Sequence, residues 1–481
     1  MRRIPLAVFL AVQALLSFWN LGLLSPWGDE AATLTLIRHS PAYMVQVAAH
    51  DVHPPVFYLL LWGWQHLPLG LDPAVQARIL TVLFALAATV AADRLLASRL
   101  SERGRSWFLA LWCVSPCLLL YARMSRSYSM QVLAGVLAVG CLLRCLEKPG
   151  RRYVIFTAVA LLAAVYTHYL PGLVLTGAAN LALLWRRRWR DAVLADAIFA
   201  AGLTPWAVWL ARSIEAWSRH NEGYAAIGGA AEYGLKAAYW GVSFVAGEAV
   251  PDVLLVAGLV LTPVCAVVLW RSRRALPQLF ALTAVLAAAG FLGVARWVSY
   301  QFVPARLLFL LPLVLALFAA GAAMHPRTGG AAVGALLCIS LAGDWCYFHK
   351  QGFRNKEYPM PMREIAARMA PGSAVLVDAT NSDPAALKYA LGPGREVWLT
   401  TDPRTPPRLA GDSAGTVWFL RNTHDVSAAG LNARCEAELK RSMRLVSVRG
   451  YEPFTPLERR AMGLLGMPAP EYFGELLEFR K

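Results

Sequence analysis

Five polar clusters interrupt this mostly apolar sequence, and they hold the residue types best suited to catalysis. They are Asp29 with Glu30, Asp51–Pro55, Tyr121–Tyr128, Tyr166–Tyr169 and Arg296–Arg306. A carboxylate can remove the proton of a hydroxyl group as that group attacks. Arginine binds phosphate oxygens through forked, charge-assisted hydrogen bonds. The acids, histidines and arginines therefore suit the binding of an anionic phosphate and the activation of a hydroxyl.

Each cluster also has a purely structural interpretation. Asp29 and Glu30 begin a helix-like stretch, where the helix dipole favours negative charge. Each of the other charged side chains, taken alone, also has a structural explanation. These explanations are solvation in a loop, hydrogen bonding near aromatic residues, and snorkelling. The side chains concerned are Arg123, Arg126, His168 and Arg306. No single residue establishes a functional site. The combination of acids, histidines and arginines at one predicted depth, on one side of the membrane, favours one.

The composition excludes an ordinary soluble protein. Of the 481 residues, 57% are hydrophobic and 16% are charged, against about 25% charged in soluble domains. The 46 basic and 30 acidic residues give a formal net charge of +16. The basic residues form short clusters between apolar runs, which argues against nucleic-acid binding. The eight cysteines contain no CxxC pair and are interpreted as structural thiols. A polytopic α-helical membrane protein is the remaining fold class.

Eleven apolar segments approach the length needed to cross a bilayer, which is about 20 residues. The first segment lacks a small-residue cleavage site, so an uncleaved helix is predicted instead of a signal peptide. The predicted spans are residues 4–24, 74–98, 106–122, 126–146, 152–169, 170–186, 190–212, 252–270, 276–296, 304–323 and 329–348.

Arginine and lysine residues predict the orientation of these spans. They gather in alternate connections, at residues 2–3, 94–105, 144–152, 186–190, 271–274 and 327. This alternation predicts a cytoplasmic N-terminus, and an odd number of spans then places the C-terminus outside. Residues 54–69 would break the alternation if they spanned, so an interfacial helix is predicted there, within an outer loop of residues 25–73. Residues 234–250 stay ambiguous for the same reason.

The sequence predicts two domains. Residues 1–349 form the membrane domain, and the polar clusters fall at its outer side. Residues 350–481 form a soluble, extracytoplasmic α/β domain, because short apolar runs alternate there with helix-like stretches. The predicted strands are 373–378, 395–400, 415–420 and 443–448, and the predicted helices are 383–391 and 426–440.

Five motifs, in order along the chain, resemble those of the GT-C superfamily of membrane glycosyltransferases. The resemblance is to the branch related to protein O-mannosyltransferases (glycosyltransferase family 39) and lipid A aminoarabinose transferases. The motifs are WGDEA (Trp27–Ala31), DVHPPVFYLLL (Asp51–Leu61), YARMSRSYSM (Tyr121–Met130), YTHYL (Tyr166–Leu170) and PARLLFLLP (Pro304–Pro312). They spread over most of residues 1–350, so a GT-C fold of about eleven spans is implied.

The resemblance implies inverting transfer of a hexose or pentose from a polyprenyl-phosphate donor on the outer face of a bacterial inner membrane. The acceptor would be an envelope glycan, a lipid or a protein. Asp29 falls on the general base, and Glu30 is the adjacent acid of that motif. His53 falls on a phosphate-contacting position, whereas Asp51 orients the acceptor or helps to bind a metal. The other donor- or substrate-binding candidates are Arg123, Arg126, Tyr128, His168 and Arg306.

Metal dependence and two other function classes stay open in the sequence. Asp29, Asp51 and His53 could ligate a divalent cation, yet no ligand spacing requires one. A secondary transporter is compatible with eleven spans, although transporter charges cluster near the bilayer midplane and recur between repeats. A non-catalytic scaffold for envelope assembly would leave the acids without a role. The predicted partners are the lipid-linked donor, its acceptor and membrane lipids, and nucleic acid is not among them.

Overall fold

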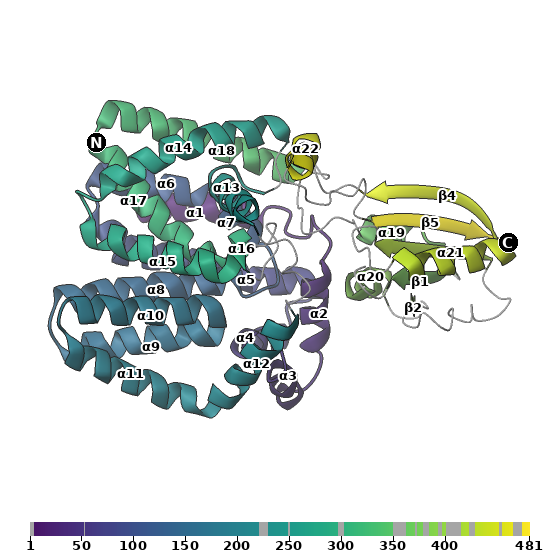
Figure 1. Cartoon of the computed structure of the whole chain (residues 1–481), viewed down its shortest axis with the longest axis horizontal. Coiled ribbons are helices and arrows are strands. Elements are labelled where there is room, and N and C mark those ends of the chain that lie inside the picture. The colour runs from purple at the N-terminus through teal and green to yellow at the C-terminus, as the bar shows by residue number, and fades with distance from the viewer. Residues whose placement is uncertain are drawn as a thin grey trace. The chain divides into compact units, whose positions relative to one another are not determined.

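The computed structural model of the chain consists of two compact units (Figure 1), which are described separately. One unit contains residues 1–21 and 36–349, and the other contains residues 22–35 and 350–481. The structure describes residues 4–51, 53–220, 229–248, 251–296, 303–349, 362–370, 373–378, 384–392, 397–400, 415–422, 429–451, 455–464 and 474–481.

The first unit is helical, and its helices begin where the sequence provides helix-starting residues. Proline occupies the first turn of several of them, where its missing N–H costs no hydrogen bond. Asp72 caps α5 by accepting hydrogen bonds from the next backbone N–H groups. The helices are α1 (Leu6–Phe18), α3 (Pro41–Ala48), α4 (Val56–Gln65), α5 (Pro73–Leu95), α6 (Glu102–Cys113), α7 (Pro116–Ala122), α8 (Tyr128–Glu147), α9 (Arg151–Thr167), α10 (Tyr169–Trp185), α11 (Trp189–Leu203), α12 (Ala207–His220), α13 (Ala230–Ala246), α14 (Asp252–Ser272), α15 (Pro277–Ala295), α16 (Val303–Arg306), α17 (Leu311–Ala323) and α18 (Pro326–His349).

Each of the eleven predicted spans contains a helix in the structure. In the described part of the chain, six helical segments are long and apolar enough to cross a membrane, and α6 with α7, bent by 50°, gives a seventh. Three further apolar helical segments are shorter: Leu6–Phe18, Tyr169–Trp185 and Leu308–Ala323. Multiple membrane-crossing helices are therefore confirmed, and the total of eleven stays a prediction.

Two segments with ambiguous sequences also form helices. Helix α4 covers part of residues 54–69 and has 10 residues, which is half of what a simple crossing needs. Its position at the membrane interface stays a prediction. Helix α13 covers most of residues 234–250 and has 17 residues.

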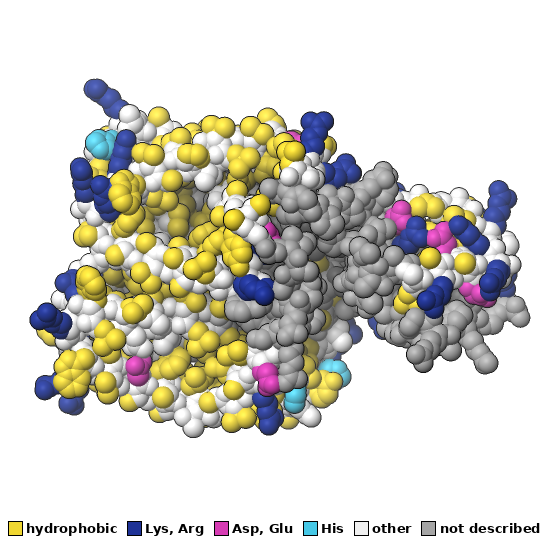
Figure 2. Space-filling model, viewed as in Figure 1, with side chains coloured by type: hydrophobic (Ala, Val, Ile, Leu, Met, Phe, Trp, Pro, Cys, Tyr) yellow, Lys and Arg dark blue, Asp and Glu magenta, His cyan; other side chains and the backbone are white. Residues whose placement is uncertain are grey.

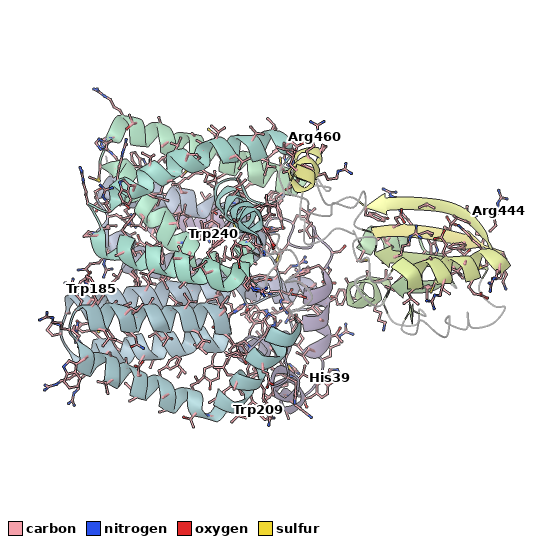
Figure 3. All side chains as sticks on the ribbon, in the orientation of Figure 1. His39, Trp185, Trp209, Trp240, Arg444 and Arg460 are labelled. Carbon is pink, nitrogen blue, oxygen red and sulfur yellow. The ribbon has the colours of Figure 1, made fainter. Side chains whose placement is uncertain are left out.

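Two of the basic connections meet at one end of the helical unit. Arg144 donates a hydrogen bond to the carbonyl oxygen of Arg94 at 3.3 Å, and Arg99 pairs with Glu147 at 2.9 Å. Figure 2 shows Lys and Arg side chains gathered mainly at the end that holds the N-terminus, with hydrophobic side chains along the helices. Trp185 and Trp209 lie toward opposite ends of this unit (Figure 3), as expected for aromatic residues at two membrane interfaces.

The second unit is built on one mixed sheet with the strand order β2-β1-β3-β5-β4. Strand β1 runs parallel to β2 and β3, whereas β5 runs antiparallel to β3 and β4. The elements are α2 (Gly28–Leu36), α19 (Met362–Arg368), β1 (Ala374–Asp378), α20 (Pro384–Leu391), β2 (Val397–Thr400), β3 (Thr416–Asn422), α21 (Ala429–Ser442), β4 (Arg444–Tyr451), α22 (Pro456–Leu464) and β5 (Gly474–Arg480).

Alternation along β1 gives the sheet two apolar faces. Val375 and Val377 belong to a buried cluster with residues of α19 and α20, and fully buried Ala31 of α2 belongs to the same cluster. Ala374 and Leu376 belong to the opposite cluster, which α21 covers with Cys435 and Leu439. The segment that carries the first acidic motif therefore packs with the C-terminal residues.

The four predicted strands and two predicted helices of this unit are confirmed with shifts of a few residues. Strand β5 was not predicted, because Glu475, Glu478 and Arg480 interrupt its apolar pattern. In the structure, Glu475 pairs with Arg421, and Glu478 accepts a hydrogen bond from Ser447 at 3.1 Å. Charges that look unsuited to a central strand are thus paired by neighbouring strands.

Candidate active site

Asp51, His53 and Arg126 form a chain of polar contacts in the helical unit. Nη2 of Arg126 lies 3.1 Å from Nε2 of His53, and Nδ1 of His53 lies 3.4 Å from Oδ2 of Asp51. A guanidinium group only donates hydrogen bonds, so Nε2 of His53 is the acceptor and Nδ1 carries the hydrogen. The contacts therefore assign one neutral tautomer of His53.

The environment of His53 favours this neutral form. His53 lies between α3 and α4, just before Pro54. Burial lowers the pKa of His53 below its ordinary value of 6.5, and the positive charge of Arg126 lowers it further. The hydrogen bond and charge of Asp51 act in the opposite direction, while Arg306 adds to the lowering. The net result is a neutral imidazole at neutral pH.

His168 and Arg306 make a second contact of the same kind. Nη1 of Arg306 lies 3.4 Å from Nε2 of His168, which again leaves the ring hydrogen on Nδ1. His168 is 5% exposed, and its Nδ1 has no hydrogen-bond partner among the described residues. This tautomer therefore has a buried N–H group with no acceptor among the described residues.

The chain positions His168 by breaking a helix. His168 has an extended backbone (φ −160°, ψ 123°) between the end of α9 and the start of α10. It lies at the opposite end of α9 from Arg151, and thus opposite a basic connection. Its ring lies 5.7 Å from the ring of His53, at an interplanar angle of 78°. Residues from three distant motifs, at His53, His168 and Arg306, are thereby brought together with Arg126.

Arg123 is placed differently, although it lies in the same motif as Arg126. Its guanidinium donates to four backbone carbonyl groups and to the hydroxyl of Tyr347 at 3.0 Å. The carbonyl acceptors belong to Leu16, Ser17, Trp19 and Asn20. The side chain is 3% exposed and lies against the rings of Tyr347 and Phe348. These contacts engage the N–H groups of Arg123 within the protein. They therefore favour a structural role for Arg123 over binding of the lipid-linked sugar donor.

Tyr128 begins α8 and is 2% exposed. Its ring contacts the ring of Tyr121 at 4.9 Å. The two tyrosines flank the turn that carries Arg126. Tyr128 thus packs beside the turn that carries Arg126, and its contact with substrate stays a prediction.

Asp29 and Glu30 belong to the second unit, in the first turn of α2. Glu30 is fully buried, while Asp29 is partly exposed. The hydroxyl of Thr33 donates to the carbonyl oxygen of Asp29 at 2.7 Å, one turn along the helix. Of the two acids, Asp29 is the more exposed residue.

Sequence patterns did not identify two polar residues that contact the framework of this site. Gln131 lies one turn after Tyr128, and its Nε2 donates to the carbonyl oxygen of Arg306 at 3.2 Å. Glu248 follows α13 and accepts a hydrogen bond from Tyr121 at 2.5 Å. A polar residue within an apolar helix, and an acid in an apolar segment, are the signals that could have drawn attention to them.

The geometry around His53 does not suit a metal ion. The described residues contain no group of three or more histidine, cysteine, aspartate or glutamate side chains arranged to hold one. Both ring nitrogens of His53 are engaged, with a guanidinium beside Nε2. A cation at that nitrogen would be repelled by Arg126.

The arrangement suits an anion. The guanidinium groups of Arg126 and Arg306 each contact a histidine, and the two histidine rings lie 5.7 Å apart. The carboxylate of Asp51 supplies one negative charge beside His53. Charge-assisted hydrogen bonds of arginine to phosphate are short and strong, and a buried setting strengthens them further. The site can therefore hold a phosphate group and stabilise charge that develops on it.

Solved structures of other proteins share the fold of this chain. ArnT from Cupriavidus metallidurans in the apo state matches with a TM-score of 0.59 and 15% identity, over 92% of this chain and 95% of that chain. The structure of ArnT bound to undecaprenyl phosphate matches with a TM-score of 0.54 and 14% identity, over 98% and 97%. The fold is of the GT-C type. The GT-C fold expected from the five motifs is thereby confirmed.

A larger GT-C protein matches as well. The arabinofuranosyltransferase AftD from Mycobacteria gives a TM-score of 0.53 and 16% identity over 99% of this chain, which spans 40% of AftD. No protein-family model and no curated protein sequence matches the chain. At these identities the likeness establishes the GT-C fold alone.

Proposed function

We propose that this protein is a membrane glycosyltransferase that uses a polyprenyl-phosphate sugar donor. The observation that carries the proposal is the convergence of Arg126–His53 and Arg306–His168, with the two imidazole rings 5.7 Å apart. The GT-C fold supports it, because one structure with this fold, that of ArnT, has undecaprenyl phosphate bound. The predicted topology places the site at the outer face of a bacterial inner membrane, with the C-terminal unit outside.

The phosphate of the donor would bind between the two arginines. Their two positive charges and the one negative charge of Asp51 leave an excess of one positive charge for the phosphate. Nδ1–H of His168 would donate a third hydrogen bond to it, while Asp51 keeps His53 in the tautomer that accepts from Arg126. The site thus matches a phosphate in charge and in hydrogen-bond donors.

The transfer would proceed by direct displacement. The hydroxyl oxygen of the acceptor attacks the anomeric carbon, and Asp29 takes the hydroxyl proton. The bond between the anomeric carbon and the phosphate oxygen breaks, and its electron pair leaves with the lipid phosphate. The sugar is transferred with inversion. Arg126 and Arg306 stabilise the additional negative charge on the leaving phosphate.

Deletion and complementation in the native host test this function even while the identity of the sugar is open. We expect deletion to remove one sugar modification from the envelope glycans, lipids or proteins and to raise the level of a lipid-linked sugar, both measured by mass spectrometry. The wild-type chain restores the modification, and Asp29→Asn does not, because an amide cannot accept the proton. Asp196→Asn on α11 is the matched control, since Asp196 accepts a hydrogen bond from Asn180 on α10, outside the candidate site.

Unchanged envelope glycans and lipid-linked sugars after deletion would contradict the proposed function. Full complementation by Asp29→Asn, at equal protein levels in the membrane, would contradict only the role of Asp29 as base.

A further inference from the structure

The buried carboxylate of Glu248, outside the phosphate site, links helices α7 and α13. Glu248 lies just after α13 and is 3% exposed. The hydroxyl of Tyr121 on α7 donates to its Oε1 at 2.5 Å, and the hydroxyl of Tyr239 on α13 donates to its Oε2 at 3.3 Å. The shorter distance is typical of a hydrogen bond from a hydroxyl to an ionised carboxylate.

The first of these contacts leads to Arg126. Tyr121 lies near the end of α7, and its ring packs on Tyr128 at the start of α8, at 4.9 Å and 70°. The turn between these two residues carries Arg126. A fixed Tyr121 hydroxyl therefore limits how far this turn can move.

The second contact leads to Arg306. Tyr239 is a buried residue of α13, and α13 packs against α16, which ends at Arg306. The amide of Gln131 on α8 also donates to the backbone of Arg306 at 3.2 Å. The helices that present the two arginines are thus connected through α13 and through α8.

A glycine permits the close approach of Glu248 to α7. Gly247 has a φ of +86°, and a Cβ atom at this position would lie 2.8 Å from Cβ of Pro116, the first residue of α7. Any side chain at residue 247 would force α7 and the end of α13 apart. The local backbone is therefore built to bring Glu248 and Tyr121 together.

We propose that Glu248 is a positioning residue that sets the spacing of Arg126 and Arg306 by holding Tyr121 and Tyr239. This role rests on the proposed function, because it assumes that the two arginines bind the donor phosphate. A carboxylate accepts from both tyrosine hydroxyls at once, with one oxygen for each. Glutamine at this position has one acceptor oxygen, so one of the two tyrosine hydroxyls can no longer donate to residue 248. The contact that holds α7 or α13 at this point is then weakened.

Binding of undecaprenyl phosphate to the full-length protein in nanodiscs tests this role. We expect Glu248→Gln to raise the Kd about tenfold, the effect of losing one hydrogen bond to a charged group. Tyr239→Phe removes the weaker of the two contacts and should raise the Kd less. The combined effect of Tyr121→Phe and Glu248→Gln should be smaller than the product of the single effects, because both remove the same contact.

Thr89→Val provides the matched control for general destabilisation. It removes a buried hydrogen bond of 2.5 Å between Thr89 on α5 and Gln13 on α1, a contact that involves neither the two tyrosines nor Glu248. We expect a lower Tm with an unchanged Kd. A Glu248→Gln protein that loses thermal stability like Thr89→Val and keeps the wild-type Kd would overturn the positioning role. Wild-type protein that does not bind undecaprenyl phosphate would overturn the proposed function as well.

Discussion

Nη2 of Arg126 lies 3.1 Å from Nε2 of His53, although 73 residues separate them along the chain. The contact explains why two motifs with unrelated sequences belong to one site. Because guanidinium is a donor only, it fixes the imidazole in the form that accepts from arginine and donates toward Asp51. The same arrangement recurs between Arg306 and His168, so two arginines are oriented by neutral histidines that add no positive charge.

The two arginines should determine donor binding. We expect Arg126→Ala and Arg306→Ala each to raise the KM for the lipid-linked donor about tenfold to hundredfold, since each removes charge-assisted hydrogen bonds of about 1.5–3 kcal/mol. The KM for the acceptor should change much less. Steady-state kinetics with each substrate varied in turn measures the difference. Unchanged donor kinetics in both variants would remove these residues from the site.

His53 should make stability depend on pH. Its pKa in the folded protein is lowered below 6.5, so the unfolded chain binds a proton at higher pH than the folded protein does. The stabilisation is fully present above about pH 6.5, the ordinary histidine value, and is lost as the pH falls toward the lowered value. Thermal unfolding in detergent between pH 7.5 and 5 should show this loss in wild-type protein and less of it in His53→Asn. Identical pH profiles of stability in the wild-type protein and in His53→Asn would contradict the attribution of this loss to His53.

Arg123 should affect stability more than catalysis. Its guanidinium bonds to four backbone carbonyl groups and to Tyr347, so Arg123→Ala leaves several buried acceptors without this donor. We expect a loss of roughly 2–4 kcal/mol in stability, measured as a lower Tm. The KM for the donor in the remaining folded protein should stay near the wild-type value. A raised donor KM at unchanged Tm would instead place Arg123 in the donor site.

The packing of Ala31 should affect the transfer rate, because Ala31 holds the helix that carries Asp29. It follows Asp29 and Glu30 and lies in the buried cluster that contains Ile365 and Val375. Ala31→Asp places a charge in this cluster and should destabilise the packing of α2 by about 2 kcal/mol or more. We expect kcat to fall while the affinity for undecaprenyl phosphate is kept. A smaller polar change, Ala31→Ser, is the graded control, and wild-type kcat in both variants would refute the coupling.

Chelation should leave the activity intact. The ring nitrogens of His53 are occupied by Asp51 and Arg126, and the transfer proposed above needs no Lewis acid. We expect the transfer rate to be the same with and without EDTA. A loss of activity that added Mg²⁺, Mn²⁺ or Zn²⁺ restores would show that the metal considered for Asp29, Asp51 and His53 takes part.

Local patterns in the amino-acid sequence account for much of the secondary structure. Runs of apolar residues of nearly membrane-crossing length fix helices because a backbone in lipid has to satisfy its own hydrogen bonds. The short apolar run at residues 373–378 likewise predicted strand β1. The candidate residues His53, Arg126, His168 and Arg306 were also found from their types, since charges in apolar surroundings are costly without a function or a partner.

The contacts among those residues depend on how the helices pack. Arg123 and Arg126 are three residues apart and chemically identical. Arg123 donates its hydrogen bonds to backbone carbonyl groups, whereas Arg126 contacts His53. The tautomers of the histidines and the connections through Glu248 depend on atoms contributed by helices far apart in the chain. Such contacts follow from how the helices pack, and a local pattern of hydrophobic and polar residues contains no information about them.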